Sequence, residues 1–320
     1  MRTLKVAVIG DAIIDEYHYT EPLGQTGKGN ILAVKYKSME QFAGGAIAVA
    51  NHIAGFVDQV TLLSALGQEN SQEAFIRNKL AENVRAEFLY FTSAPTVIKR
   101  RYVDADSSAA KLFEVYFYEE EPRDQVLEQA ACQWIKENLS QFDLVVVSDF
   151  GNGFIAGDMI QAICDEAQFL SVNTQINSGN RGYHVITRYP HADFIALNEP
   201  ELRLAAHDRY SALTEIATQI GEQLEASKMA ITRGTQGAMM LSFNPKEAYD
   251  CPALSTKIVD RVGAGDSFLA LASLCLASGI SPEISLFVAS SAAALDVQIV
   301  CNREAISPIS LYKYMNTLLK

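Results

Sequence analysis

Four short runs of apolar residues stand out along the chain, and each is followed by polar or glycine residues. They are KVAVI at 5–9, LVVV at 144–147, FIAL at 194–197 and MAIT at 229–232. Continuous β-branched runs of this length predict strands that are buried on both faces of a parallel sheet. Because ligands bind beyond the carboxyl ends of such strands, we expect the polar residues after them to converge on one edge.

Helical periodicity fills the stretches between these strands. Apolar residues recur at helical spacing, with polar residues on the opposite face, over residues 46–53, 71–82, 124–138 and 211–226. Alternating strands and helices predict an α/β fold of the doubly wound kind, in which helices cover both faces of a mostly parallel sheet.

Two segments interrupt this alternation. Residues 16–41 read as a loop followed by a strand, and residues 85–121 contain the β-branched and aromatic runs FLYF, TVIKRRYV and KLFEVYFY. We expect both segments to form a small antiparallel lid, inserted discontinuously into a main domain made of residues 1–15, 42–84 and 122–320. A lid beside the strand ends would exclude water from a bound ligand.

Composition and charge narrow the classes of function. The chain has 320 residues and a formal net charge of −12, which argues against nucleic acid and anionic membranes as partners. Its five cysteines lack metal-ligand spacing and are expected to be free thiols. We find neither a signal peptide nor a membrane-spanning run, so we expect a cytoplasmic protein.

The strongest chemical signal is DRVGAGDSF at residues 260–268, which precedes a long apolar stretch. Gly263 and Gly265 allow the backbone of residues 263–265, including Ala264, to direct N–H groups at an anion, aided by the positive end of the following helix. Asp266 would then accept a proton from an attacking hydroxyl group. The same pattern also fits an ordinary helix start with a capping aspartate and turn glycines.

Two further patterns allow a structural and a functional interpretation. Gly44 and Gly45 open a helix of small residues, which permits either close approach to a ligand or tight packing. Lys99 and Arg101 lie on one face of a predicted lid strand, and Arg100 lies on the other. They are either a charged, solvated strand edge or a clamp for a phosphate group on the acceptor.

GGAIAVANHIA at 44–54 and DRVGAGDSF, in this order and separation, resemble the two signatures of the ribokinase-like (PfkB) carbohydrate kinases. SDFGNG at 148–153, NEPE at 198–201 and TRGTQG at 232–237 are also similar to that family. TVIKRRYV, SDFGNG and the ISP at 306–308 look closest to its heptose-phosphate kinase branch. The resemblance covers essentially the whole chain and implies transfer of the γ-phosphoryl group of ATP to a hydroxyl of a sugar or sugar phosphate.

The resemblance also implies a role for each matching residue. Asp266 would be the catalytic base beside the anion hole of residues 263–265. The acceptor would contact Asp15, Gly44 and Gly45. The nucleotide and its Mg²⁺ would be held by Asn198, Thr232, Gly234 and Gly237, with Glu201 serving the metal. Arg261 departs from the family pattern, and its long cationic side chain would either touch nucleotide phosphate or close the site differently. Asn198 and Glu201 also fit a helix-capping pair.

Similar proteins often bind a monovalent cation near the GAGD sequence and form homodimers through the lid, so both are expected here. Arg261, Ala48 and Asn173 depart from the family pattern. They leave two alternatives open, a nucleoside kinase on the same fold and a nucleotide- or sugar-binding protein that has lost catalysis. The basic run at 99–101 argues against the first alternative, and the retained Asp266 argues against the second.

Overall fold

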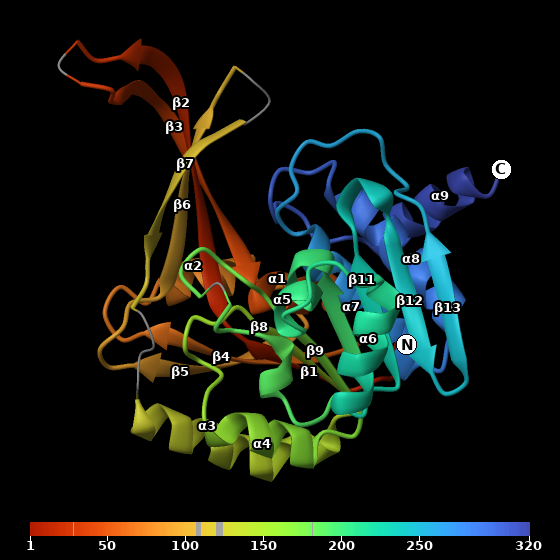
Figure 1. Cartoon of the computed structure of the whole chain (residues 1–320). Coiled ribbons are helices and arrows are strands. Elements are labelled where there is room, and N and C mark those ends of the chain that lie inside the picture. Colours follow the sequence, from red (N-terminus) through yellow and green to blue (C-terminus); the bar gives the residue numbers. More distant parts are fainter. Residues whose placement is uncertain (28, 107–109, 120–123, 181) are drawn as a thin grey trace.

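The computed structural model describes residues 1–27, 29–106, 110–119, 124–180 and 182–320. Within these residues, nine strands form a large sheet in the order β13-β12-β11-β10-β9-β8-β1-β4-β5. Neighbouring strands from β11 to β5 run parallel, and β12 and β13 add an antiparallel hairpin at one edge. The predicted mostly parallel α/β sheet is therefore confirmed (Figure 1).

The four predicted strands appear as β1, β8, β10 and β11, within one or two residues of the expected ranges. The strands of the large sheet are β1 Val6–Gly10, β4 Val60–Gly67, β5 Val84–Phe91, β8 Leu144–Asp149, β9 Leu170–Thr174, β10 Phe194–Asn198, β11 Lys228–Thr232, β12 Ala238–Phe243 and β13 Lys246–Cys251. Their side chains alternate between two hydrophobic cores, one on each face of the sheet.

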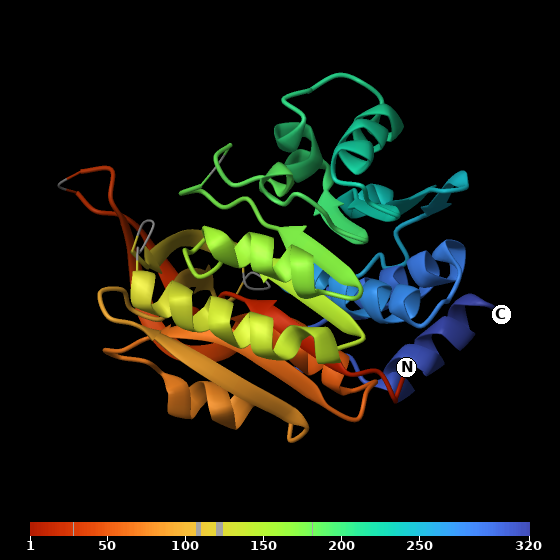
Figure 2. The same ribbon diagram turned by 90° about the horizontal axis from the view of Figure 1, so that it is seen from below.

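Helices cover both faces, and all four predicted helical segments contain a helix. The helices are α1 Ala46–Ala54, α2 Glu73–Lys79, α3 Gln125–Asn138, α4 Asp158–Glu166, α5 Glu199–Ala205, α6 Leu213–Gln223, α7 Ala264–Ala277, α8 Pro282–Asp296 and α9 Pro308–Leu318, with 3-10 turns η1 Leu139–Gln141, η2 Ile186–Arg188 and η3 Gly234–Gln236. One core contains side chains from α3 to α6, and the other contains side chains from α1, α2 and α7 to α9. Figure 2 shows α3 and α4 side by side along one face.

A second sheet, the lid, rises from the edge of the main body (Figure 1). Its strands, in the order β3-β2-β6-β7, are β2 Ala12–Gln25, β3 Leu32–Gly45, β6 Val97–Asp104 and β7 Ala110–Phe117. Two details of the predicted lid are wrong. The β2–β6 pair is parallel, so the lid is not purely antiparallel. Residues 16–25 belong to a strand rather than a loop, because β2 is central and its backbone pairs with a strand on each side.

A third correction concerns residues 85–91, which we assigned to the lid. They form β5, the edge strand of the large sheet, and pair in parallel with β4. Phe91 is buried in one core, and Phe88 packs on the other, so the strand is fixed by both faces of the main domain. The alternation that signalled a lid strand is equally typical of such an edge strand. The predicted boundary between residues 121 and 122 lies outside the described residues.

Candidate active site

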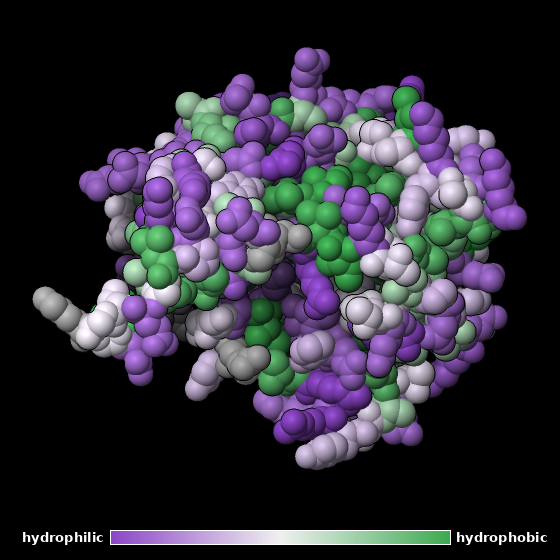
Figure 3. Space-filling model, turned by 90° about the horizontal axis from the view of Figure 1, so that it is seen from above, coloured by the Kyte–Doolittle hydropathy of each residue, from purple (hydrophilic) through white to green (hydrophobic). Residues whose placement is uncertain are grey.

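The predicted site residues gather where the lid joins the carboxyl-terminal edge of the large sheet. β8, β10 and β11 end there at Asp149, Asn198 and Thr232. The lid strands reach the same edge, because β2 starts directly after β1 and its Ala12 pairs with Gly45 of β3. Seen from above, the surface is hollowed between the lid and the main body, with hydrophilic side chains inside the hollow (Figure 3). This arrangement agrees with convergence of polar groups on one edge.

The glycine loop, residues 260–265, leads into the buried helix α7. Gly263 precedes the helix with a φ of 99°, a left-handed conformation that favours glycine. At Gly265 there is open space, since a Cβ added there would have no atom within 4 Å. The first N–H groups of a helix have no partners within the helix, and here they adjoin this open space. The loop can therefore receive an anion at the positive end of α7.

Asp266 is half-buried in the first turn of α7, where its N–H donates to the carbonyl oxygen of Gly263 at 2.8 Å. Burial raises the pKa of Asp266 well above its ordinary value, and the carboxylates of Asp296 and Asp15 raise it further. The charge of Lys99 lowers the same pKa. The fold thus brings together three residues that the sequence analysis singled out separately, namely Asp266, Asp15 and Lys99.

Asp15 and Lys99 lie opposite each other on the paired strands β2 and β6. Asp15 is 3% exposed and Lys99 is 8% exposed, so neither is a solvated surface residue. Burial lowers the pKa of Lys99, and Asp15 opposes that effect. Its ammonium group lies over the rings of Phe150 and Tyr116, at 5.4 and 5.7 Å from their centroids. In the described part of the chain it forms no salt bridge.

Arg101 is buried beside Lys99, and Arg100 points to the opposite face of the lid, as strand alternation predicts. The guanidinium group of Arg101 pairs with the carboxylate of Asp15, and its Nε donates to Glu114 at 3.0 Å. Arg100 pairs with Glu16 at 2.6 Å. Of these three cations, Arg101 and Arg100 are engaged by protein carboxylates, whereas Lys99 is available to a ligand.

Gly44 and Gly45 end β3 directly before α1. A Cβ on Gly44 would collide with a carboxylate oxygen of Asp15, and a Cβ on Gly45 would collide with the carbonyl oxygen of Asp11. Gly45 also has a left-handed φ of 62°. Both positions therefore need glycine for packing alone, and their backbone lies directly beside Asp15.

Asn198 and Glu201 form the helix-capping pair that the sequence analysis left open. The Asn198 side chain accepts from Glu201 N–H at 2.9 Å, and Glu201 accepts from Asn198 N–H at 2.8 Å. The other carboxylate oxygen of Glu201 accepts from Ile176 N–H at 3.3 Å. Burial raises the pKa of Glu201 to about 7. Both of its oxygens are thus engaged by the main chain.

Thr232 pairs with Asn198 in the sheet, and the following turn contains Gly234 and Gly237. A Cβ on Gly237 would collide with the carbonyl oxygen of Cys251, so this position needs glycine. At Gly234 a Cβ would meet no atom within 4 Å, which leaves its backbone open to a ligand. Arg261 is exposed at the start of the glycine loop.

Asp260 is a site residue whose partners the sequence analysis missed. Its carboxylate accepts from Tyr17 Oη at 2.5 Å and from Lys111 Nζ at 3.2 Å, both of which belong to lid strands. It also accepts from the N–H groups of Arg261 and Cys301, at 2.7 and 3.2 Å. A single buried carboxylate therefore joins the lid to the glycine loop. No local sequence signal marks these contacts, since Lys111 and Asp260 are far apart along the chain.

Asp11 and Asp149 form a second buried network, beneath Lys99. Asp11 accepts from the N–H of Phe150 at 2.9 Å, and burial together with Asp149 raises its pKa to about 6. Asp149 accepts from Tyr189 Oη at 2.7 Å and pairs with His184 and Arg188 at 3.0 and 3.2 Å. These contacts fix the SDFGNG segment and, with it, the ring of Phe150 that lies below Lys99.

Asp296 and Asn302 were also missed, although both lie beside Gly263. A Cβ on Gly263 would meet Asn302 Oδ1 and Asp296 Oδ2. The two carboxylate oxygens of Asp296 are buried and accept no hydrogen bond within the described structure. Burial raises the pKa of Asp296 to about 7. Neither residue belongs to a recognisable motif, so only the fold reveals their position.

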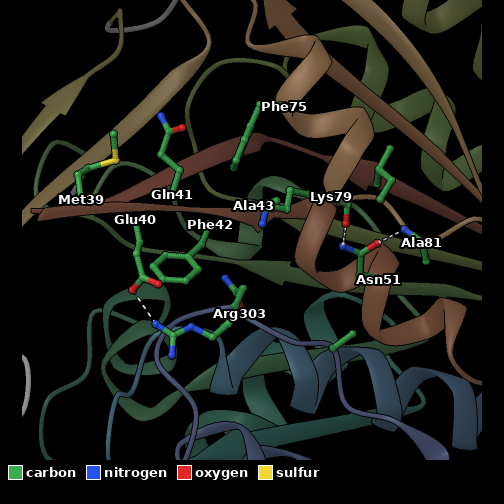
Figure 4. Close-up of a pocket in the computed structure, with 13 residues that line it drawn as sticks. Met39, Glu40, Gln41, Phe42, Ala43, Asn51, Phe75, Lys79, Ala81 and Arg303 are labelled. Atoms are coloured by element: carbon green, nitrogen blue, oxygen red, sulfur yellow. Dashed lines mark hydrogen bonds and ion pairs between the residues drawn. The ribbon is translucent and has the colours of Figure 1, made fainter.

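A pocket of about 670 Å³ lies beside β3, bounded by residues 39–43, by the α1–α2 region and by residues 302–305 (Figure 4). The Asn51 side chain bonds Lys79 O and Ala81 N there, both at 2.9 Å, so it is structural. Arg303 donates to Glu40 across the pocket at 2.6 Å. Asn302 lines this pocket as well, and it connects the pocket to the glycine loop.

Three broader expectations can be compared with the described residues. All five cysteines are free, as expected. No group of three histidine, cysteine or acidic side chains in the described ranges is arranged to hold a metal ion. In the same part of the chain, every helix is too short or too polar to cross a bilayer.

Comparison with known proteins supports the family resemblance. The model of the pfkB family carbohydrate kinases matches residues 3–305. The bifunctional protein HldE of Koribacter versatilis is 25% identical over 317 residues, which cover 98% of this chain and 63% of that protein. The D-beta-D-heptose 7-phosphate kinase of Bordetella bronchiseptica is 27% identical over 280 residues, which cover 87% of this chain and 85% of that protein. The chain thus spans about three fifths of the length of its bifunctional relatives.

Solved structures show the same fold at low sequence identity. Phosphofructokinase-2 from Escherichia coli has a TM-score of 0.78 at 16% identity, with 100% of both chains covered. Ribokinase from Thermotoga maritima has a TM-score of 0.72 at 18% identity, with 98% of this chain and 99% of that chain covered. The match to the family model over residues 3–305 shows that the chain belongs to the pfkB family of carbohydrate kinases.

Proposed function

We propose that the chain transfers the γ-phosphoryl group of ATP to a hydroxyl of a sugar phosphate, with Asp266 as the general base. The observation that carries this proposal is the convergence of Asp266, Asp15 and Lys99 beside the amino-terminal end of α7. The acceptor oxygen would bond to the γ-phosphorus while the bond to the bridging oxygen of ADP breaks. The proton of the acceptor hydroxyl would pass to Asp266.

The electrostatic setting of Asp266 supports this role. A carboxylate with an ordinary pKa is a weak base at neutral pH, whereas burial and two neighbouring carboxylates raise the pKa of Asp266. The N–H groups of Ala264 and Gly265 at the start of α7 would stabilise negative charge on the transferred group. Asp266 would therefore act at the boundary between the acceptor and this anion hole.

The buried ammonium group of Lys99 supports the proposal that the acceptor already carries a phosphate group. A buried ammonium group is costly unless an anion balances it, and the nearby Arg101 already occupies the Asp15 carboxylate. We therefore revise the predicted clamp. Lys99 would contact the acceptor phosphate, and Arg101 would hold Asp15 in place to bind sugar hydroxyls beside Gly44 and Gly45. The name of the Bordetella relative, a heptose 7-phosphate kinase, agrees with such an acceptor.

The nucleotide would lie on the other side of the glycine loop. Thr232, Gly234 and Gly237 form a turn at the end of β11, and the open backbone at Gly234 is suited to phosphate. Asn198 lies at the adjacent strand end, and the exposed Arg261 can reach nucleotide phosphate. ATP between these residues would direct its γ-phosphoryl group toward Asp266.

The cation sites fit less well. Both carboxylate oxygens of Glu201 accept main-chain hydrogen bonds, so direct binding of Mg²⁺ by Glu201 does not fit this arrangement. A divalent ion would be held chiefly by the nucleotide phosphates. A monovalent cation near the glycine loop stays a prediction. Asp260, the carboxylate that begins this loop, already receives the ammonium group of Lys111.

A homodimer through the lid is also proposed. Large apolar side chains are exposed on the lid face that carries Arg100, and they include Met39, Phe113 and Phe117. An exposed apolar face on a small sheet is typical of an interface. A second copy of the chain is the partner that this face would accept. A cytoplasmic location, where ATP is available, agrees with the five free cysteines.

An assay of ATP consumption over a panel of sugars, sugar phosphates and nucleosides tests the proposal. We expect the highest kcat/KM with a sugar phosphate and formation of ADP and a bisphosphorylated sugar. A preference for nucleosides would instead support the nucleoside kinase. Tight binding of ATP with no turnover on any acceptor would support the binding protein.

A further inference from the structure

We propose that the side-chain amide of Asn302 binds the acceptor and orients its reacting hydroxyl group toward Asp266. This inference rests on the proposed function, and it adds a specificity-determining contact that neither signature motif contains. Asn302 lies between α8 and α9, outside both motifs. It would recognise a neutral group that donates a hydrogen bond, such as a sugar hydroxyl.

The side-chain amide of Asn302 lies between the two signature motifs. Asn302 Nδ2 lies 3.4 Å from the place that a Cβ on Gly44 would occupy. On its other side, Asn302 Oδ1 lies so close to Gly263 that a Cβ there would collide with it. Gly44 belongs to the acceptor side of the proposed site, and Gly263 begins the anion hole. One side chain therefore spans the place where the acceptor and the phosphoryl group must meet.

Within the described residues, the amide of Asn302 has no strong hydrogen-bond partner. Asn302 Oδ1 is buried and accepts no hydrogen bond within the described residues. For Nδ2 the structure gives one weak contact, to Cys301 Sγ at 3.9 Å. A buried acceptor without a partner destabilises the folded chain. A ligand that donates a hydrogen bond to Oδ1 would remove this cost.

A strained backbone conformation at the preceding residue places Asn302. Cys301 has a left-handed φ of 49°, which is unfavourable for a residue with a side chain. Its N–H donates to Asp260 at 3.2 Å, and its buried side chain packs with Tyr17 and Phe42. These contacts hold the strained conformation, which directs the next residue between the two glycines. Strain that is held in this way is typical of functional positions.

The oxygens around Gly263 decide which ligand group the amide would meet. Asn302 Oδ1 and the carboxylate of Asp296 lie on the same side of Gly263. Two acceptor oxygens there would repel a phosphate oxygen of the nucleotide. A hydroxyl group of the acceptor beside the reacting one can donate to Oδ1, and the reacting hydroxyl then keeps its proton for Asp266 and its oxygen lone pair for the γ-phosphorus. A hydroxyl of the acceptor, rather than ATP, is therefore the partner that fits.

The test compares Asn302→Ala with the parent chain, using fructose 6-phosphate and a heptose 7-phosphate as acceptors. We expect the variant to lose about tenfold in kcat/KM for the better acceptor, as for one lost hydrogen bond, while the KM for ATP stays within twofold. Its melting temperature should equal or exceed that of the parent, because an unpaired buried amide is removed. Asn138→Ala is the matched control, since that half-buried amide bonds Trp134 O within α3.

Three results would overturn the inference. If the parent is active and Asn302→Ala has the same kcat/KM for the acceptor, Asn302 does not contact the acceptor. The proposed function is unaffected by that result. A rise in the KM for ATP alone would assign Asn302 to the nucleotide instead. If the parent phosphorylates no acceptor of the panel while it binds ATP, the proposed function fails, and the Asn302 contact fails with it.

Discussion

The ammonium group of Lys111, in the lid strand β7, lies 3.2 Å from the carboxylate of Asp260 at the start of the glycine loop. Tyr17 of β2 donates to the same carboxylate at 2.5 Å. Asp260 in turn accepts from main-chain N–H groups of the loop, so the position of the lid and the shape of the anion hole are coupled.

This coupling predicts that Lys111→Met lowers kcat although Lys111 is not a catalytic residue. Loss of a partly buried charge-assisted contact of about 1.5–3 kcal/mol would slow turnover roughly tenfold to 100-fold. Hydrogen exchange in the backbone of residues 261–266 should become faster. Lys37→Met, which removes an exposed pair with Glu21 on the same lid, is the control and should leave both measurements unchanged. Normal turnover in Lys111→Met would refute the coupling.

Lys99→Met should raise the KM for a phosphorylated acceptor at least tenfold and change the KM for ATP little. The physical reason is the loss of the buried cation that is free to meet the acceptor phosphate. Arg100→Met is the matched control, since Arg100 lies on the opposite face and pairs with Glu16. If Lys99→Met raises the KM for a neutral sugar and the KM for a sugar phosphate by the same factor, Lys99 does not recognise the phosphate.

From the raised pKa of Asp296 we predict that the stability of the folded chain depends on pH. Its pKa is about 7 in the folded chain and 3.8 ordinarily, so the unfolded state holds its proton less tightly than the folded state. The stabilisation is therefore complete below about pH 4 and is lost as pH rises through 7, with a total on the order of 4 kcal/mol.

Asp296→Asn should remove this part of the pH dependence and raise the melting temperature at pH 8. Because Asp296 also raises the pKa of Asp266, the acid limb of the pH–rate profile should move to lower pH in the variant. Exposed Asp165 offers a control, in which Asp165→Asn leaves both profiles as in the parent. A variant that keeps the stability profile of the parent would contradict the environment described for Asp296.

Local patterns in the sequence predicted four of the nine strands described in the large sheet, together with the segments that contain α1, α2, α3 and α6. The apolar runs before Gly10, Asp149, Asn198 and Thr232 are buried strands because both faces of the sheet are covered. The glycines of the two motifs lie where the backbone needs them, which Gly45 and Gly263 illustrate by their left-handed φ angles. These features depend on neighbours in sequence, and sequence reasoning finds them for that reason.

Contacts between distant segments could not be predicted in the same way. Residues 85–91 alternate like a lid strand, yet pairing with β4 places them in the large sheet. Lys111, Tyr17 and Asp260 meet only after the lid has folded onto the main domain. The partner of Arg101 was equally invisible, since a basic run in a strand does not reveal which carboxylate lies opposite it. The candidate site was thus predicted by residue type, but its internal pairing was not.

The central claim is that Asp266 accepts the proton of the acceptor hydroxyl, and Asp266→Asn tests it most directly. Asparagine keeps the size of the side chain but cannot take up that proton, and no cap is lost because the N-cap of α7 is Gly263, without a side-chain cap hydrogen bond. With the best sugar phosphate as acceptor, kcat should fall by about 10²–10⁴, while the affinity for ATP is kept. The melting temperature should not fall, because a half-buried carboxylate is replaced by a neutral amide. A purified, folded Asp266→Asn variant that turns over at the rate of the parent would contradict the account.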